Sequence, residues 1–384
     1  MAAELSFFPV DNGDMTLLTL ESGKVILIDC NIRDITGDDP PPDVLKQLKE
    51  RLKKDSNGRY FVDAFLLSHP DQDHCRGFAS AFYLGDPADY PASSNKILIK
   101  ELWSSPLIFR RKKRHETLCS DASAFNDEAR RRVRAYRASP YGVIDGNRIQ
   151  IMGEDEVGKQ QGLESIVVKA DTYFNTLCGL TQFDFRAYLL APQPQGTEEE
   201  EEVRSKNNSS VIVRFEIAAG GKSDACRFLT GGDADVTIWE RLWDRHKNTP
   251  EPLRYDVLQV PHHCSWHCLS HDSIRDYGDK AKISPDAKSA LSQTLRFARL
   301  VASCKAISPD DSDPPSHRAM QEYTAIAKAD EGRFYETADY NGEPFELEIT
   351  VAGPSPKTVR TGSGSGAGGA GTTSAVGGAV LGHG

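Results

Sequence analysis

The stretch at 66–77, LLSHPDQDHCRG, places two imidazoles and two carboxylates within six residues: His69, Asp71, Asp73 and His74. Grouping these side chains costs desolvation and carboxylate repulsion unless a cation compensates. The apolar run at 61–67 directly before them is typical of a strand, so the cluster is expected on the loop that follows it. The spacing therefore predicts that this loop supplies half of a divalent-metal site.

Further polar residues follow other apolar runs, and they are candidates for the other half. Asp29 closes VILID, Asp233 lies in LTGGDAD, and His262 and His263 close DVLQVPHH. A lone Asp after a strand is often a turn residue, and we favour turns for Asp11 and Asp14, with a position lining the site as the alternative. The strand ends in this sequence should instead meet at one sheet edge, where the Asp233 carboxylate would bridge two ions.

Alternating strand and helix patterns in two halves of the chain predict an α/β sandwich. In the first half we expect strands at 7–20, 24–28 and 61–67 and helices at 42–54 and 126–137, the last capped by Asn126. In the second half we expect strands at 207–217, 227–235, 254–263 and 305–308, helices at 236–246, 287–300 and 317–329, and a terminal hairpin around Asn341-Gly342.

Composition sets limits on the class of protein. The chain has 384 residues, a net charge of −10 and no apolar run near the roughly 20 residues of a membrane helix. The N-terminus lacks the basic segment and the long apolar segment of a secretory signal. The 8 Cys show no spacing typical of disulfides. We expect a cytoplasmic protein with no membrane partner. The Gly/Ser/Ala-rich residues 352–384 are expected to be a disordered tail.

The order of these motifs resembles the metallo-β-lactamase fold superfamily, and more narrowly its ComEC-like metallohydrolase branch. The superfamily signature HxHxDH stands here as His69-x-Asp71-x-Asp73-His74, and the segments NNSSVIVRF, FLTGGDAD, VPHHCS and SHRAMQEY follow in order. The resemblance implies an αββα sandwich of two mixed sheets flanked by helices over residues 1–351. It also implies an insertion at about 85–185 that carries basic helices.

The resemblance also implies roles for single residues. His69 and Asp71 would bind one ion, Asp73, His74 and His263 the second, and Asp233 both. Around them, Asp29, His262, Asn208 and Ser265 would orient ligands or contact substrate, and Asp73 and His317 would be catalytic. Asp71 replaces the usual second histidine, which favours Mn²⁺ beside Zn²⁺. Cys264 replaces a usual glycine, and the histidine that many members carry before the bridging aspartate is absent, which weakens the first site.

Two basic stretches, 110–114 and 130–137, could hold a DNA or RNA backbone. The rim would comprise Arg110, Arg111, Lys112 and Lys113, with Trp103 and Tyr136 stacking on bases. The alternative is a solvated face paired with the acid run at 198–202.

We expect a metal-dependent phosphodiesterase or nuclease that uses a binuclear site and a metal-bound hydroxide, with the leaving group protonated by His317 or a water. One alternative is a hydrolase of small esters or cyclic nucleotides. Another is a catalytically weak regulatory subunit of a bacterial defence system, acting with a partner protein. DNA uptake is not implied, because no membrane channel accompanies the domain.

Overall fold

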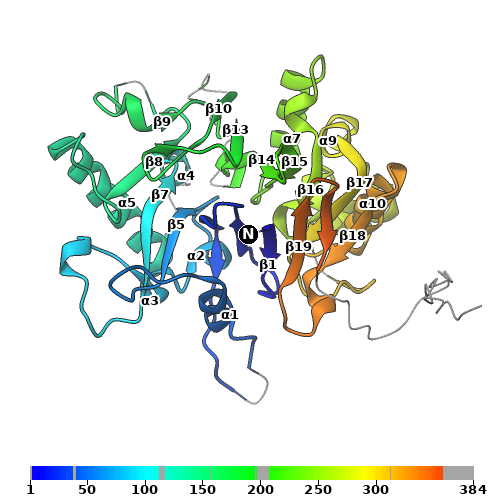
Figure 1. The fold of residues 1–384 in the computed structure, drawn as a ribbon. Helices are drawn as coiled ribbons and strands as arrows, with labels where there is room; N and C mark the ends of the chain where they lie inside the picture. Colours follow the sequence, from blue (N-terminus) through cyan, green and yellow to red (C-terminus); the bar gives the residue numbers. More distant parts are fainter. Residues whose placement is uncertain are drawn as a thin grey trace, which may run out of the picture.

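The computed structural model describes residues 2–37, 40–111, 117–156, 158–194, 196, 207–311 and 313–357, which form two large β-sheets (Figure 1). In spatial order the first sheet contains β20 (Gly353–Pro356), β19 (Phe345–Thr350), β1 (Ala3–Phe7), β2 (Thr16–Thr19), β3 (Val25–Ile28), β5 (Phe61–Leu66), β7 (Ile97–Ser104), β8 (Arg148–Met152) and β9 (Val167–Val168). The second contains β10 (Thr172–Phe174), β13 (Phe185–Ala191), β14 (Ile212–Ala219), β15 (Lys222–Leu229), β16 (Tyr255–Gln259), β17 (Thr294–Ala302) and β18 (Arg333–Glu336).

Both sheets are mixed, and each changes from antiparallel to parallel pairing part of the way across. In the first sheet β1, β2 and β3 pair antiparallel, whereas β3, β5, β7 and β8 pair parallel. In the second sheet the change falls at β15, which pairs antiparallel with β14 and parallel with β16. Loops that follow parallel neighbours leave a sheet at the same edge, where ligand sites of α/β proteins form.

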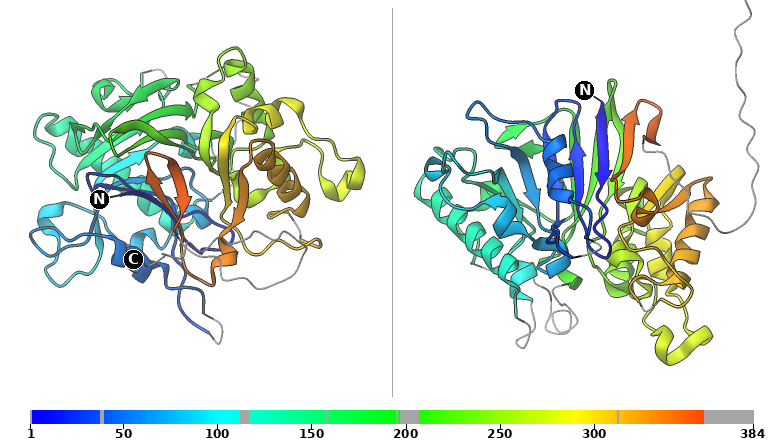
Figure 2. Two further views of the ribbon diagram at one scale, coloured as in Figure 1. Left: turned by 45° about the vertical axis from the view of Figure 1, so that its right-hand side comes forward. Right: turned by 90° about the horizontal axis from the view of Figure 1, so that it is seen from below.

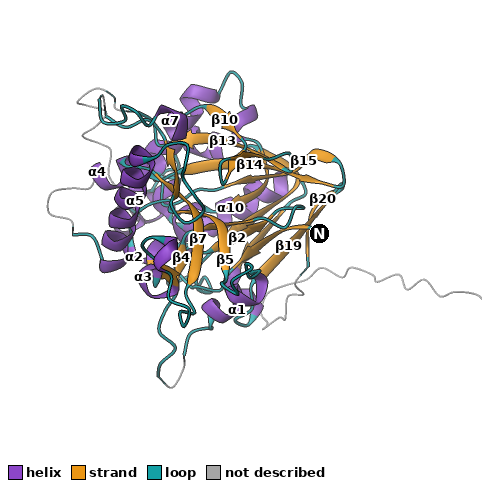
Figure 3. Ribbon diagram, turned by 60° about the vertical axis from the view of Figure 1, so that its left-hand side comes forward, coloured by secondary structure: helices purple, strands orange, loops and turns teal. Residues whose placement is uncertain are grey.

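Helices cover the outer faces of the two packed sheets, which gives the predicted αββα sandwich (Figures 2 and 3). The first sheet is flanked by α1 (Val44–Arg51), α3 (Phe78–Ala81) and α5 (Ser120–Ala138), and the second by α7 (Val236–His246), α9 (Pro285–Leu291) and α10 (His317–Ala329). Aromatic pairs join the sheets: Phe7 lies edge-on to Phe228 at 5.9 Å, and Trp103 stacks on Phe215 at 6.4 Å. The structure thus confirms the predicted fold class.

The central strand β5 shows why the sequence forms these layers. Its residues FVDAFL are buried except for the first, because one face meets the second sheet and the other meets helices. Phe65 packs against Phe78 of α3 and Phe125 of α5, at centroid distances of 5.1 and 6.0 Å. A parallel strand covered on both faces favours such a nearly continuous apolar run, which Asp63 alone interrupts in β5.

Several elements predicted in the second half of the chain differ from the structure. The helix expected at 287–300 ends at Leu291, and β17 begins at Thr294, because this segment pairs in parallel with both β16 and β18. The short strand expected at 305–308 is a loop. The hairpin expected around Asn341 does not form, because β18 pairs in the second sheet and β19 in the first.

Other boundaries in the structure also differ from the predicted ones. β19 turns back into β20, so the folded part continues beyond the predicted limit at Val351, and 358–384 lie outside the described residues. Helix α5 begins six residues earlier than Asn126, and its cap is Cys119. The segment at 85–185 supplies β7, β8 and β9 to the first sheet and β10 to the second. Within the described ranges, no helix combines the length and the apolar character that a membrane crossing requires.

Candidate metal centre

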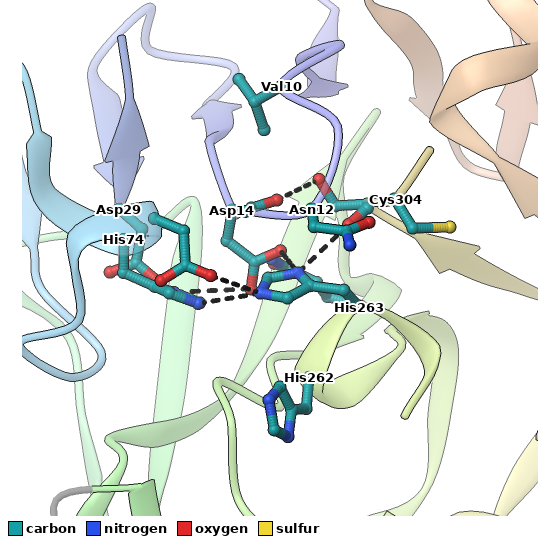
Figure 4. Close-up of polar contacts among 12 residues, drawn as sticks. Val10, Asn12, Asp14, Asp29, His74, His262, His263 and Cys304 are labelled. Atoms are coloured by element: carbon teal, nitrogen blue, oxygen red, sulfur yellow. Dashed lines mark hydrogen bonds and ion pairs between the residues drawn. The ribbon is translucent and has the colours of Figure 1, made fainter. Parts of the chain in front are cut away.

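The loops after β3, β5, β15 and β16 meet at one place, where acidic and imidazole side chains from distant parts of the chain converge. Three overlapping groups have ligand atoms within 4.8 Å of one another: Asp73, His74, Asp233 and His263; His69, Asp71 and Asp233; and Asp14, Asp29 and His74. Figure 4 shows Asp14 and the Asp29–His74 pair converging on His263, with His262 set apart from them. All six residues proposed as metal ligands from the sequence lie in these groups.

Asp233 lies at the centre of the cluster. Its Oδ2 is 3.1 Å from His69 Nε2, and its Oδ1 is 3.1 Å from His74 Nε2. The carboxylate is almost fully buried, which opposes ionisation, but the charges of His69 and His74 hold its pKa well below the usual range. The two oxygens of one ionised carboxylate therefore face different imidazoles.

Asp71 and Asp73 lie at the N-terminal end of α2 (Gln72–Cys75), Asp71 as its N-cap and Asp73 in its first turn. Asp73 Oδ2 lies 3.3 Å from His263 Nε2, and Asp71 Oδ2 lies 3.8 Å from His69 Nε2. Burial opposes ionisation of Asp73, but the hydrogen bond with His263 holds its pKa well below the usual range. The short helix thus points its two carboxylates toward different histidines.

Asp29 orients the ring of His74. Its Oδ2 lies 2.8 Å from His74 Nδ1, and its Oδ1 accepts a hydrogen bond of 2.7 Å from the backbone N–H of Ser68. Ser68, whose Oγ also bonds Asp29, was not singled out by the sequence reasoning. The buried Asp29 has a φ of +57°, a conformation that Asp tolerates better than most residues. This arrangement directs His74 Nε2 toward Asp233.

Asp14 belongs to the cluster, although the sequence favoured a turn residue there and kept a position lining the site only as the alternative. Its buried carboxylate lies 3.8 Å from His74 Nδ1 and 3.7 Å from His263 Nδ1. Burial raises the pKa of Asp14 to about 6. The preceding Gly13 was the available signal, since a Cβ there would lie 2.2 Å from Asn31 Nδ2 and 2.7 Å from the Asp73 carbonyl oxygen.

The chain after β16 adopts an unusual backbone. His262, His263 and Cys264 have φ values of +49°, +52° and +68°, and such a run of non-glycine residues is strained by roughly 1–2 kcal/mol per residue. Strain of this kind gathers at functional sites. Glycine adopts the left-handed conformation without strain, which is consistent with the glycine that the resemblance implies at the position of Cys264. His263 is buried, with Nδ1 3.1 Å from the Ser303 carbonyl oxygen.

The remaining predicted residues, His262, Ser265, Asn208 and His317, lie outside the three groups. Burial lowers the pKa of His262, whose Nε2 is 3.5 Å from Asp233 Oδ2. Ser265 is buried and accepts a hydrogen bond from the N–H of His267, and Asn208 bonds Asp235. His317 is half-buried at the start of α10.

The predicted nucleic-acid rim is only partly available. Arg110 Nε pairs with Asp155 at 2.7 Å, and Arg111 donates to the carbonyl oxygens of Gln193 and Pro194. Lys112 and Lys113 lie outside the described residues. Trp103 is fully buried, so the expectation that it stacks on bases was wrong.

Helix α5 has a basic face within the predicted stretch 130–137, from which the sequence analysis singled out no arginine. The exposed Arg130, Arg134 and Arg137 follow helical spacing and line one cavity of about 630 Å³, together with apolar residues such as Val133 and Ile151. The neighbouring arginines are structural, because Arg131 and Arg132 both pair with Glu128 at 2.7 Å. The basic stretch at 130–137 therefore divides into solvent-facing and buried arginines.

The cluster fits a divalent cation on its own chemistry. His69 Nε2, Asp233 Oδ1 and Asp14 Oδ1 are buried and make no hydrogen bond of acceptable geometry among the described residues. A buried polar atom without such a partner costs about 1–3 kcal/mol, which a bound cation would offset. Imidazole nitrogens suit Zn²⁺, and carboxylate oxygens suit Mn²⁺.

The fold and the cluster together define a two-sheet α/β protein with a candidate metal centre at the common edge of its sheets. No protein-family model matches the chain, and no curated protein matches it. Among solved structures it is similar to unliganded yeast PDE1, at 14% identity and a TM-score of 0.41, over 87% of this chain and 97% of that one. It is also similar to a possible metal-dependent hydrolase from Veillonella parvula, at 11% identity and a TM-score of 0.33, over 86% and 93%. Similarity at this level carries no argument about activity, which must come from the site.

Proposed function

We propose that this chain is a metal-dependent hydrolase that binds two divalent cations, Zn²⁺ or Mn²⁺, and cleaves phosphodiester bonds. One observation carries the proposal: the two buried oxygens of Asp233 each lie 3.1 Å from a different imidazole, His69 on one side and His74 on the other. A carboxylate in that position suits a bridge between two neighbouring ions.

The two proposed ion sites use different numbers of protein ligands. His69, Asp71 and Asp233 would hold the first ion, whereas Asp73, His74, His263 and Asp233 would hold the second. A site with only three protein ligands keeps a position for substrate or water, as catalytic centres require. This difference suggests a function for the absence of the central histidine. Without that ligand, the first ion keeps a coordination position for substrate or water.

When bound, the cations supply positive charge that acidifies a water and polarises a phosphoryl oxygen. The chain's own residues position that charge. Asp29 fixes the ring orientation of His74, and Asp73 is held ionised beside His263. We assign to His317, at the N-terminus of the thirteen-residue helix α10, the protonation of the leaving alkoxide.

For the substrate we propose a nucleic acid, held in part by Arg130, Arg134 and Arg137. These side chains are exposed on one face of α5, and no ion pair joins them to another described residue. Charge on such a face attracts phosphates, and the apolar floor of the adjacent cavity suits a base. The motif order supports a place in the ComEC-like branch. The eight free cysteines support a reducing compartment such as the cytoplasm.

A small diester such as a cyclic nucleotide is the second candidate substrate. The cavity of about 630 Å³ beside α5 has the size of sites that hold small molecules. Its lining combines cationic side chains such as Arg130 with apolar side chains such as Val133, a combination that suits the phosphate and base of one nucleotide.

The test uses the full chain loaded with Mn²⁺ or Zn²⁺ on single-stranded DNA, duplex DNA, RNA and bis-p-nitrophenyl phosphate. The Asp73→Ala/His74→Ala variant is the inactive control, and Asp11→Ala, an exposed aspartate paired with Arg33, is the matched active control. Cleavage of polymers lost only in the double variant supports a nuclease. Cleavage of the small diester alone supports the second candidate, and no cleavage by the metal-loaded chain contradicts the proposal.

A further inference from the structure

Two cysteine thiols lie side by side next to the metal loop. Cys75 Sγ and Cys119 Sγ are 3.5 Å apart, although the residues are separated by 44 positions in the sequence. Cys75 is the last residue of α2, immediately after His74, and Cys119 caps the N-terminus of α5. Both thiols are free. The pair therefore links the helix that carries Asp73 and His74 to the long helix of the outer layer.

Backbone contacts hold the two cysteines in this position. The N–H groups of Gly77 and Ala79 donate to the two carboxylate oxygens of Asp121, at 3.1 and 2.9 Å. Asp121 lies in the first turn of α5, two residues after Cys119. A disulfide has an S–S distance of about 2.05 Å, so the sulfurs need to approach by only about 1.5 Å. Side-chain rotation can provide a movement of this size without separating the helices.

The two thiols differ in the way that a redox pair requires. Cys119 is half-buried and reachable from solvent, and its sulfur accepts the N–H of Ala122 at the start of the 19-residue helix. The contact with the Cys75 thiol lowers the pKa of Cys119 to about 6. Cys75 is buried, and its sulfur lies 3.1 Å from the Asp71 carbonyl oxygen. Cys119 thus suits the reactive role and Cys75 the resolving role.

We propose that Cys75 and Cys119 form a reversible disulfide, a redox modification site attached to the metal loop. With a peroxide as oxidant, the Cys119 sulfur attacks one oxygen, the O–O bond breaks, and Cys119 becomes a sulfenic acid with release of one water. The Cys75 sulfur then attacks the Cys119 sulfur, the S–S bond forms and the S–O bond breaks. The leaving hydroxide takes the Cys75 proton as a second water, so two thiols supply the two electrons that reduce one peroxide.

Oxidation would also reach the metal centre, and this part of the inference rests on the proposed function. The disulfide draws the Cys75 sulfur toward Cys119 and away from the Asp71 carbonyl oxygen, which lies 3.1 Å from it in the reduced chain, and it ties α2 to α5. Loss of an outer contact of this kind lowers metal affinity about tenfold or more. We therefore expect the oxidised chain to bind Mn²⁺ more weakly than the reduced chain.

The experiment treats the reduced full chain with one equivalent of hydrogen peroxide, alkylates the remaining thiols and maps the peptides by mass spectrometry. The buried Cys30, which lies beside Cys75 through a backbone bridge, gives the matched control Cys30→Ala. We expect a Cys75–Cys119 linked peptide, two hydrogens lighter, that dithiothreitol reverses. It should persist in Cys30→Ala and vanish in Cys119→Ser, with an unchanged circular dichroism spectrum showing that this variant folds.

Recovery of Cys75 and Cys119 as alkylated thiols, or a disulfide that joins other cysteines, would overturn the proposal. The Mn²⁺ affinity of both forms is measured in parallel, and equal affinities would overturn the coupling to the metal loop. A chain that binds no metal in either form would contradict the proposed function while leaving the mass-spectrometric result to decide the disulfide.

Discussion

Asp29 Oδ2 lies 2.8 Å from Nδ1 of His74, and this contact decides which nitrogen of the ring faces the candidate metal centre. With Nδ1 directed at Asp29, Nε2 lies 3.1 Å from Asp233 Oδ1 and 3.3 Å from His263 Nε2. An outer carboxylate of this kind fixes the tautomer of a metal-binding histidine and raises its basicity.

Asp29→Asn should therefore weaken metal binding by about 10–100-fold while preserving the fold. Asn tolerates the left-handed backbone at this position, where φ is +57°, so the change removes charge with little added strain. Competition against a chelator of known affinity measures the effect. Asp11→Asn is the matched control, because Asp11 also has a left-handed backbone but is exposed, pairs with Arg33 and belongs to none of the three groups. Equal affinities of both variants would argue against the role of Asp29.

Asp233→Ala should reduce the bound metal from two ions to one at most and should abolish hydrolysis. Among the described residues, Asp233 is the one that belongs both to the group with His69 and to the group with His263, so its carboxylate would contact both ions. Asp235→Ala is the matched control, because it removes a neighbouring carboxylate that belongs to none of the three groups. The Asp235 side chain caps α7 by accepting the N–H of Thr237, so its loss should lower the free energy of unfolding by about 1 kcal/mol.

The Asp235 variant should nevertheless keep both ions and its activity. Metal analysis and urea unfolding of the two variants separate these effects. A full metal complement in Asp233→Ala would show that the carboxylate does not bridge.

Metal affinity should increase as the pH rises from about 6 to 8. Burial opposes protonation of His74, but the carboxylates of Asp233 and Asp29 raise its pKa well above the usual range in the metal-free chain. A cation must displace that proton, so binding is opposed at low pH and favoured as the pH increases. Calorimetry in buffers of different ionisation enthalpy would report the released proton, and affinity that does not change with pH would contradict this account.

Replacing Arg130, Arg134 and Arg137 with Ser should weaken nucleic-acid binding and make it less sensitive to salt. Each phosphate contact to a single strand contributes about −0.7 to the slope of log K against log salt, so three contacts predict a slope smaller by about 2. The matched control replaces Arg254, Arg275 and Arg296, three exposed arginines of the other half. The same loss in both triple variants would indicate a response to net charge alone.

The local motif at 66–77 and the apolar strands before each ligand made the cluster predictable from sequence. Each ligand follows a strand, and parallel strands of one sheet end at a shared edge. Asp233 follows β15 of the second sheet and His74 follows β5 of the first, so their convergence also depends on how the two sheets pack. Asp14 was not predictable in the same way, because an aspartate in a Gly-containing loop is typical of a turn. Only the close approach of Gly13 to the Asp73 backbone distinguishes it, and that contact joins residues 60 positions apart.

Features decided by long-range pairing were the least predictable. The segment at 294–302 has apolar residues at spacings that suit a helix or a strand, and its position between β16 and β18 makes it a strand. Arg110 looked available for a ligand because its partner, Asp155, lies 45 residues further along the chain. The local sequence determines neither which strand pairs with a segment nor which residue pairs with a surface charge.

Elemental analysis of the purified chain, loaded with Mn²⁺ or Zn²⁺ and freed of excess metal by gel filtration, tests the central claim most directly. The account predicts about two metal ions per chain, and no more than one in Asp233→Ala. A loaded chain that retains no stoichiometric metal would contradict it.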